Sequence, residues 1–260
     1  MNLSIKVLLF PLLFAVFISL VPGITAQDIA QDIDDQRQNE LARIDQILRE
    51  MSDFLSSAPS FGFTAHEIID EVEEGRRIQY SNTRSVVVRR PNRLAGEVSG
   101  DLVNRSFWFD GRSFTLLDRE YNTYLQTPAP DTIDNLLDAI EEQLEVVVPL
   151  GEMLSQNVYQ ALTPLIQEAT YLGLHQVRGI ECHHLGFGQE DLDWQLWVDA
   201  GTTPAPRKIV INYRQEFGHP AYQALITDWR VDLELPDTLF EFSAPKGARQ
   251  IEMTPVEDNE

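Results

Sequence analysis

Cysteine is almost absent from this sequence, which has one, Cys182, among its 260 residues. A single cysteine cannot form a disulfide within its own chain, so a fold held together by internal disulfides is excluded. The fold must therefore be stabilised by a hydrophobic core. A chain of this length is long enough to bury one.

Basic residues are also scarce. The chain has 20 lysines and arginines against 41 aspartates and glutamates, which gives a formal net charge of −21 at pH 7. Nucleic acids and anionic membranes attract proteins through concentrated positive charge. We therefore expect no nucleic-acid partner and no general affinity for anionic membranes.

Motifs of common catalytic and nucleotide-binding sites are missing. The sequence has no Gly-x-Ser-x-Gly elbow, no phosphate-binding loop and no dinucleotide fingerprint. The segment His66–Asp70 begins like a zinc-protease motif, but Asp70 stands where the second histidine belongs, and the segment has the periodicity of a strand. We predict no catalytic residue and no cofactor, and interpret Glu67 and Asp70 as part of a solvated strand end.

The sequence has one long apolar run, at its N-terminus. The run from Val7 to Val21 follows Lys6 and precedes Pro22-Gly23 and Thr25-Ala26. This layout is typical of a secretory signal peptide, residues 1–26, cleaved near Ala26, and the run is short for a membrane span. The one cysteine, Cys182, is far from the end of the run, so lipid attachment at the new N-terminus is excluded. We predict a soluble exported protein without a membrane-spanning segment.

The rest of the chain is predicted to form one domain, residues 41–253, between a flexible acidic leader at 27–40 and a disordered tail at 254–260. Apolar residues recur at spacings of three and four from Leu41 to Leu55, which predicts an amphipathic helix. A second helix is predicted from Asp131 or Thr132 to Pro149, followed by shorter helical pieces up to residue 166.

Strand-like runs with a period of two surround this helical insert. About five are predicted between residues 61 and 117, and six or seven follow: Ala169–Val177, Ile180–Phe187, Asp193–Asp199, Arg207–Gln215, Tyr222–Val231, Leu239–Ser243 and Arg249–Met253. Such closely spaced strands indicate an antiparallel meander. We predict a mainly β (α+β) fold, with one large curved antiparallel sheet or incomplete barrel and the helices on one face.

The clearest hairpin turns at Asp110-Gly111, a dipeptide that favours a two-residue type I′ turn. In that register Phe109 pairs with Arg112, Phe107 with Phe114, and Arg105 with Leu116. Phe107, Phe109, Phe114 and Leu116 then share the face that we assign to the interior.

The segment Glu181-Cys182-His183-His184 suggests a metal site at first sight. On a strand the side chains alternate, so Cys182 and His184 share one face and His183 lies on the other. Either face supplies two ligands, fewer than the three or four that a zinc site uses. We predict no metal site, and a metal-dependent hydrolase built on Cys182, His183 or His184 is a remote alternative.

Several strands are apolar on both faces, as in Phe107–Phe109, Leu196–Val198 and Ile209–Ile211. Antiparallel sheets usually expose one face to water, so these strands need cover on both. Either a closed core or a ligand cavity satisfies this requirement. The residues that we predict to line such a cavity are Phe107, Phe109, Phe114, Leu116, Trp194, Leu196, Ile209 and Ile211.

Four arginines form a local basic group in this acidic chain: Arg84, Arg89, Arg90 and Arg93. One interpretation is a hairpin rim that forms salt bridges to the surplus carboxylates. The other is contact with an anionic headgroup or a partner protein. The sequence leaves both open.

Several strand and turn motifs occur together: Val86–Leu94 (VVVRRPNRL), Phe107–Gly111 (FWFDG), Tyr121–Tyr124 (YNTY), Asp193–Asp199 (DWQLWVD) and Leu235–Phe242 (LPDTLFEF). In these segments the chain resembles an uncharacterised family of predicted periplasmic proteins, over nearly the whole sequence after the leader. That family is similar in fold to the lipoprotein-carrier superfamily of LolA, LolB and LppX, incomplete barrels with a helical lid that hold acyl chains. The resemblance implies a LolA-like fold and a periplasmic location.

The apolar strands and this resemblance together predict a periplasmic, carrier-like protein that binds a lipid, an acylated molecule or another hydrophobic compound between sheet and helices. The alternative is an envelope sensor or protein-interaction domain on the same fold, with an envelope protein as its partner.

Overall fold

The structure, a computed structural model, describes residues 25–144 and 148–252. The predicted tail and all but the last two residues of the predicted signal peptide lie outside these ranges. The chain divides into two units at Asn39 and Glu40, and the sheet and the cavity considered below belong to the second unit. Among the described residues, no helix combines the length and the apolar character that crossing a membrane requires.

Helix α1 (Ala26–Ser57) is longer than the sequence pattern predicted, because it includes residues 27–40. The structure thus places the segment that we expected to be a flexible leader in a helix. Thr25 and Asp28 form a reciprocal cap, in which each side chain accepts the other's backbone N–H. Residues 27–40 contain neither glycine nor proline, so nothing interrupts the helix. The predicted stripe is buried from Ile44 to Leu55, whereas Leu41 is exposed.

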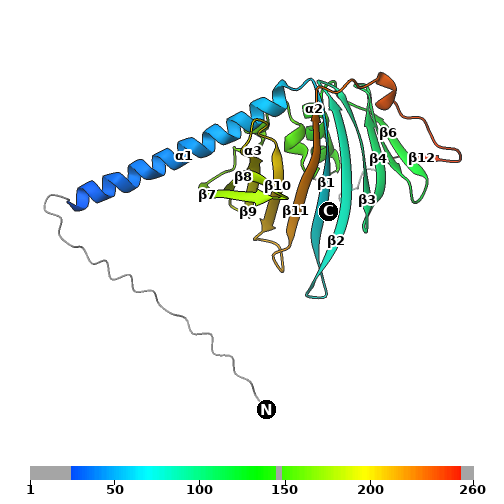
Figure 1. The fold of residues 1–260 in the computed structure, drawn as a ribbon. Helices are drawn as coiled ribbons and strands as arrows, with labels where there is room; N and C mark the ends of the chain where they lie inside the picture. Colours follow the sequence, from blue (N-terminus) through cyan, green and yellow to red (C-terminus); the bar gives the residue numbers. More distant parts are fainter. Residues whose placement is uncertain (1–24, 145–147, 253–260) are drawn as a thin grey trace, which may run out of the picture. The chain divides into compact units, whose positions relative to one another are not determined.

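In the part of the chain that the structure describes, twelve strands form a single sheet, in the order β12-β6-β5-β4-β3-β2-β1-β11-β10-β9-β8-β7 (Figure 1). The first meander consists of β1 (Ser60–Glu73), β2 (Arg76–Arg89), β3 (Arg93–Gly100), β4 (Asn104–Phe109), β5 (Ser113–Asp118) and β6 (Thr123–Pro128). The second consists of β7 (Glu168–Val177), β8 (Ile180–Gly188), β9 (Leu192–Asp199), β10 (Pro206–Tyr213) and β11 (Ala221–Val231). The two meanders join where β1 pairs with β11. The predicted fold class, a mainly β fold with one large antiparallel sheet, is confirmed.

The register of the β4–β5 hairpin differs from the prediction by two residues. Phe109 pairs with Phe114, and Phe107 pairs with Leu116, so the connection contains four residues instead of two. The carboxylate of Asp110 causes this: its Oδ1 accepts the backbone N–H groups of Arg112, at 2.9 Å, and Ser113, at 2.8 Å. A shift of two residues keeps every side chain on its predicted face.

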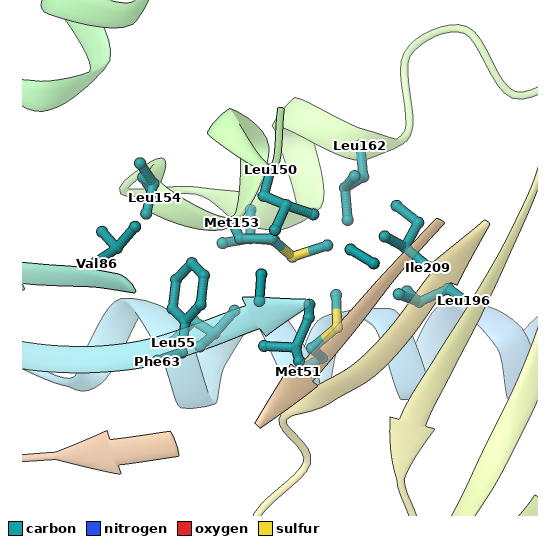
Figure 2. Packing of buried hydrophobic residues seen from close by; sticks show 14 of the residues in the cluster. Met51, Leu55, Phe63, Val86, Leu150, Met153, Leu154, Leu162, Leu196 and Ile209 are labelled. Carbon is teal, nitrogen blue, oxygen red and sulfur yellow. The ribbon is translucent and has the colours of Figure 1, made fainter. Parts of the chain in front are cut away.

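Three helical segments lie against the inner face of the sheet: α2 (Ile133–Leu144), η1 (Gly151–Leu154) and α3 (Val158–Leu162). The hydroxyl of Thr132 caps α2 by accepting the N–H of Asn135. Together with residues 44–55 of α1, these segments and the inner-face side chains form one hydrophobic core. Figure 2 shows Met51 of α1 and Met153 of η1 beside Leu196 and Ile209.

The C-terminal segment covers part of the outer face of the first meander. Residues 239–243, predicted as a strand, are not one; the turn η2 (Asp237–Leu239) precedes an irregular stretch. Phe240 is completely buried there, and the ring of Phe242 lies 5.2 Å from that of Trp108 and 4.9 Å from that of Tyr124. The chain then adds β12 (Arg249–Ile251) parallel to β6, so the sheet is not wholly antiparallel. The C-terminal segment therefore provides outer-face cover for the two-sided apolar strand Phe107–Phe109.

Replacing Phe242 by alanine is expected to lower the free energy of unfolding by about 1–2 kcal/mol, because both aromatic contacts and part of the outer-face cover are lost. Urea denaturation would measure the change. Phe217→Ala is the matched control, since Phe217 is 80% exposed. Equal losses in the two variants would contradict a role for the C-terminal segment in covering the sheet.

Candidate ligand-binding cavity

A cavity of about 480 Å³ lies between the first meander and the helical segments. Its sheet side is formed by inner-face residues of β1 to β5 and the loop between β3 and β4, and its roof by α2 and the stretch that leads into η1. The apolar residues around it are Phe63, Ile69, Val86, Leu94, Val98, Leu102, Val103, Phe107, Phe114, Leu116, Leu137, Ile140, Val148, Pro149, Leu150 and Leu154. The volume is within the range of about 300–1,000 Å³ that is usual for small-molecule sites.

The cavity lies on this half of the sheet because the other half is filled by the protein's own side chains. Over the second meander, Ile47 and Met51 of α1, together with Val158 and Leu162 of α3, pack into the core. Among the residues that the structure describes, the roof over β2 to β5 consists of α2 and the η1 region, and no residue of α1 lines the cavity. The apolar inner face of the first meander is therefore covered without being completely filled.

The predicted cavity residues all lie on the inner face, but they divide into two groups. Phe107, Phe114 and Leu116 line the cavity. The other five belong to the packed core or contact it: Phe109, Trp194, Leu196, Ile209 and Ile211. Ligand contact therefore stays a prediction for the first three. The remaining five lie where α1 and the short helices already cover the sheet, apart from Phe109, which is fully buried at the end of β4.

A buried polar cluster adjoins the cavity, and it corrects the interpretation of Glu67 and Asp70 as a solvated strand end. Glu67 is 1% exposed and Asp70 is 7% exposed. The guanidinium of Arg84 donates to Glu67 at 2.7 Å, and the hydroxyl of Tyr222 donates to it at 3.0 Å. Burial and the Glu67 carboxylate raise the pKa of Tyr222, so the phenol stays protonated and keeps donating.

Asn82 lies on β2 directly opposite Glu67 and also lines the cavity. Its side chain is buried, with 5% of the residue exposed, and its Oδ1 has no hydrogen-bond partner. On the β3 side of β2, Asn82 pairs with Gly100, and a Cβ atom added to Gly100 would lie 2.4 Å from Oδ1 of Asn82. Glycine at position 100 therefore leaves the space in which the amide of Asn82 sits.

The four arginines of the basic group bond within the chain. Arg84 pairs with Glu67, and Arg89 pairs with Asp237 and also donates to the backbone oxygen of Leu235. The guanidinium of Arg90 donates to three backbone oxygens in α1 and the η1 region, and Arg93 donates to Asn92. These contacts agree with the salt-bridge interpretation for Arg84 and Arg89 and give Arg90 a structural role.

The cysteine and the two histidines are separated by the strand as predicted. Cys182 is fully buried on the outer face, and burial raises the pKa of its thiol to about 11, so it is a poor nucleophile. His184 lies on the same face, and His183 lies on the inner face beside Tyr171. Among residues 25–144 and 148–252, no three His, Cys, Asp or Glu side chains are grouped so that they could hold a metal ion.

Acidification below pH 6.5 is expected to destabilise the protein through His184. This ring stacks on Trp197, and its two nitrogens lie 2.9 Å from His175 Nδ1 and from Gln195 Oε1. Burial, with His175 and Lys208 nearby, lowers the pKa of His184 below its usual 6.5. The unfolded chain therefore binds more protons than the folded one just below pH 6.5, and the free energy of unfolding falls as the pH falls.

Thermal unfolding between pH 7.5 and 5.5 would measure this effect. We expect His184→Gln to lose fewer degrees of Tm over this range than the wild type, because glutamine does not titrate. The exposed His219, changed to glutamine, serves as the control. Parallel Tm curves for wild type and His184→Gln would contradict the prediction.

Comparisons with known proteins identify the relatives of this chain. A family profile described as "Predicted periplasmic protein (DUF2092)" matches residues 44–254. Comparison with curated protein sequences finds no significant match. The location that the sequence predicted is confirmed by the family description.

Three solved structures illustrate the likeness in fold. An uncharacterised conserved protein from Thermus thermophilus is 11% identical, with a TM-score of 0.48, over 80% of this chain and 98% of that one. LprF from Mycobacterium bovis is 14% identical, with a TM-score of 0.47, over 75% and 96%. The lipoprotein LppX from Mycobacterium tuberculosis is 12% identical, with a TM-score of 0.45, over 74% and 99%. Such distant matches carry no information about the ligand.

Proposed function

Because the chain belongs to the family of predicted periplasmic proteins (DUF2092), we propose that it works in the periplasm as a carrier-like protein that binds a lipid or an acylated molecule in its cavity. The observation that supports this most is the cavity of about 480 Å³ with apolar side chains on the sheet side and the roof. Burial of an acyl chain contributes about 0.8 kcal/mol per methylene group. An apolar guest can therefore bind there without a catalytic group.

The alternative, an interaction domain that recognises an envelope protein through its arginines, has less support. Arg84, Arg89 and Arg90 already bond to carboxylates or backbone oxygens of the same chain. Recruiting them to a partner would break these contacts. We therefore propose ligand binding in the cavity as the function.

Native mass spectrometry of protein purified from a periplasm, followed by solvent extraction, tests this proposal. We expect a bound fraction with added mass and a lipid or acylated compound in the extract. Stripped protein should then bind the neutral apolar dye N-phenyl-1-naphthylamine with an increase in fluorescence. Empty protein that also fails to bind the dye would contradict the proposal.

A further inference from the structure

The lining of the cavity is apolar except for one group of polar side chains. Three polar side chains reach it from the sheet, those of Asn82, Arg84 and Arg105. Asn82 is the most deeply buried residue of the three, and its Oδ1 has no partner. A buried polar group without a hydrogen bond is unfavourable, because the hydrogen bonds that it made to water in the unfolded chain are not replaced in the folded protein. The amide oxygen now lies over Gly100, so it gains a hydrogen bond when the amide turns and presents this oxygen to a guest in the cavity.

The side-chain amide of Asn82 can act as a donor or as an acceptor. A half-turn about its terminal torsion exchanges the positions of the oxygen and the NH₂ group. Either atom can then face the cavity, while the space above Gly100 accommodates the other. The amide can thus bond a hydroxyl, a carbonyl or another amide of a guest.

The charges at the cavity are already balanced. The guanidinium of Arg84 is 2.7 Å from the buried carboxylate of Glu67, and that of Arg105 is 3.4 Å from Asp118. These two arginines are the charged residues that line the described part of the cavity. An anionic headgroup would lose its hydration in the cavity without gaining an unpaired cation, so its binding is unfavourable. The net charge of the chain, −21, also repels anions.

We propose, as a consequence of the proposed function, that the guest is an acyl compound with an uncharged, hydrogen-bonding polar group, such as an ester, hydroxyl or amide, and that this group docks at Asn82. The acyl chain lies along Val98, Phe107 and Leu116. The side-chain amide of Asn82 forms a hydrogen bond to the polar group, and the Arg84–Glu67 ion pair keeps this part of the cavity electrically neutral.

Displacement of N-phenyl-1-naphthylamine at pH 8 by two guests with the same C12 chain tests this inference. We expect glycerol monolaurate, which is neutral, to bind at least about tenfold more tightly than laurate, which is anionic. In Asn82→Leu, which replaces the amide by an apolar group of similar size, glycerol monolaurate should bind about tenfold more weakly through the loss of one hydrogen bond. The affinity for the dye itself should not change.

Asn104→Leu is the matched control, since Asn104 is exposed and does not line the cavity; it should behave as the wild type. Asn82→Leu removes an unpartnered buried polar group, so its Tm should equal or exceed that of the wild type. Laurate binding as tightly as glycerol monolaurate to the wild type would overturn the inference and leave the proposed function standing. Failure of the dye and of both guests to bind would overturn the proposed function as well.

Discussion

Two tryptophans introduced together, Val98→Trp and Leu116→Trp, are expected to weaken ligand binding strongly. Both residues line the cavity, Val98 on β3 and Leu116 on β5. Indole rings at these positions would occupy the space of at least about four methylene groups of a guest, which contribute about 0.8 kcal/mol each. The affinity for N-phenyl-1-naphthylamine should fall by about two orders of magnitude. Fluorescence titration would measure the change.

The control for this experiment places a tryptophan on the opposite face of the sheet. Ile68 lies on β1, is 37% exposed and does not line the cavity, so Ile68→Trp should retain full binding. The doubly substituted protein should keep a cooperative thermal transition, because the added rings fill a void instead of displacing packed atoms. Unchanged dye affinity in a folded double variant would place the binding site elsewhere.

Replacing Arg84 by leucine is expected to lower the free energy of unfolding by about 3–5 kcal/mol. The substitution leaves the carboxylate of Glu67, whose side chain is completely buried, without its cation. The bond from Tyr222 remains, but one neutral donor cannot compensate for the lost charge. Chemical denaturation monitored by tryptophan fluorescence would measure the loss.

Removing the whole cluster should be much less damaging than removing one member. In the triple variant Glu67→Leu, Arg84→Leu, Tyr222→Phe, no buried polar group of the cluster is left unpaired, so most of the lost stability should return. Arg105→Leu is the surface control, because this side chain is 46% exposed, and it should cost at most about 1 kcal/mol. A triple variant as unstable as Arg84→Leu would show that the packing of these side chains, and not their charge, stabilises the sheet.

Side-chain periodicity was sufficient to predict most of the strands, the buried part of α1 and the faces of the sheet, but it missed the helix over residues 27–40 and gave a false strand at 239–243. The stripe of α1 and the inner position of Phe107, Phe109, Phe114 and Leu116 follow from spacing alone. The hairpin register was wrong because the carboxylate of Asp110 bonds two backbone N–H groups and lengthens the turn. The preference of Asp-Gly for a type I′ turn describes the backbone conformation only and does not take these side-chain hydrogen bonds into account.

The position of the cavity could not be predicted, because it depends on which helix covers which strands. Trp194 and Leu196 are as apolar as Phe107 and Leu116, yet the first two are buried in the core that contains residues of α1, whereas the other two line the cavity. The burial of Glu67 was missed for a similar reason. Its partners, Arg84 and Tyr222, come from different strands, and Tyr222 is 155 residues away along the chain.

The junction of β1 with β11 has a consequence for how the chain reaches its native state. Every other antiparallel pairing joins strands that follow one another in the sequence. The strands of each meander can therefore pair locally, starting from the turns that connect them. The junction requires residues near the two ends of the domain to meet, at a considerable entropic cost of loop closure. Refolding should therefore have a late, slow phase in which two preformed halves dock, and the buried bond between Tyr222 and Glu67 would form only in that last step.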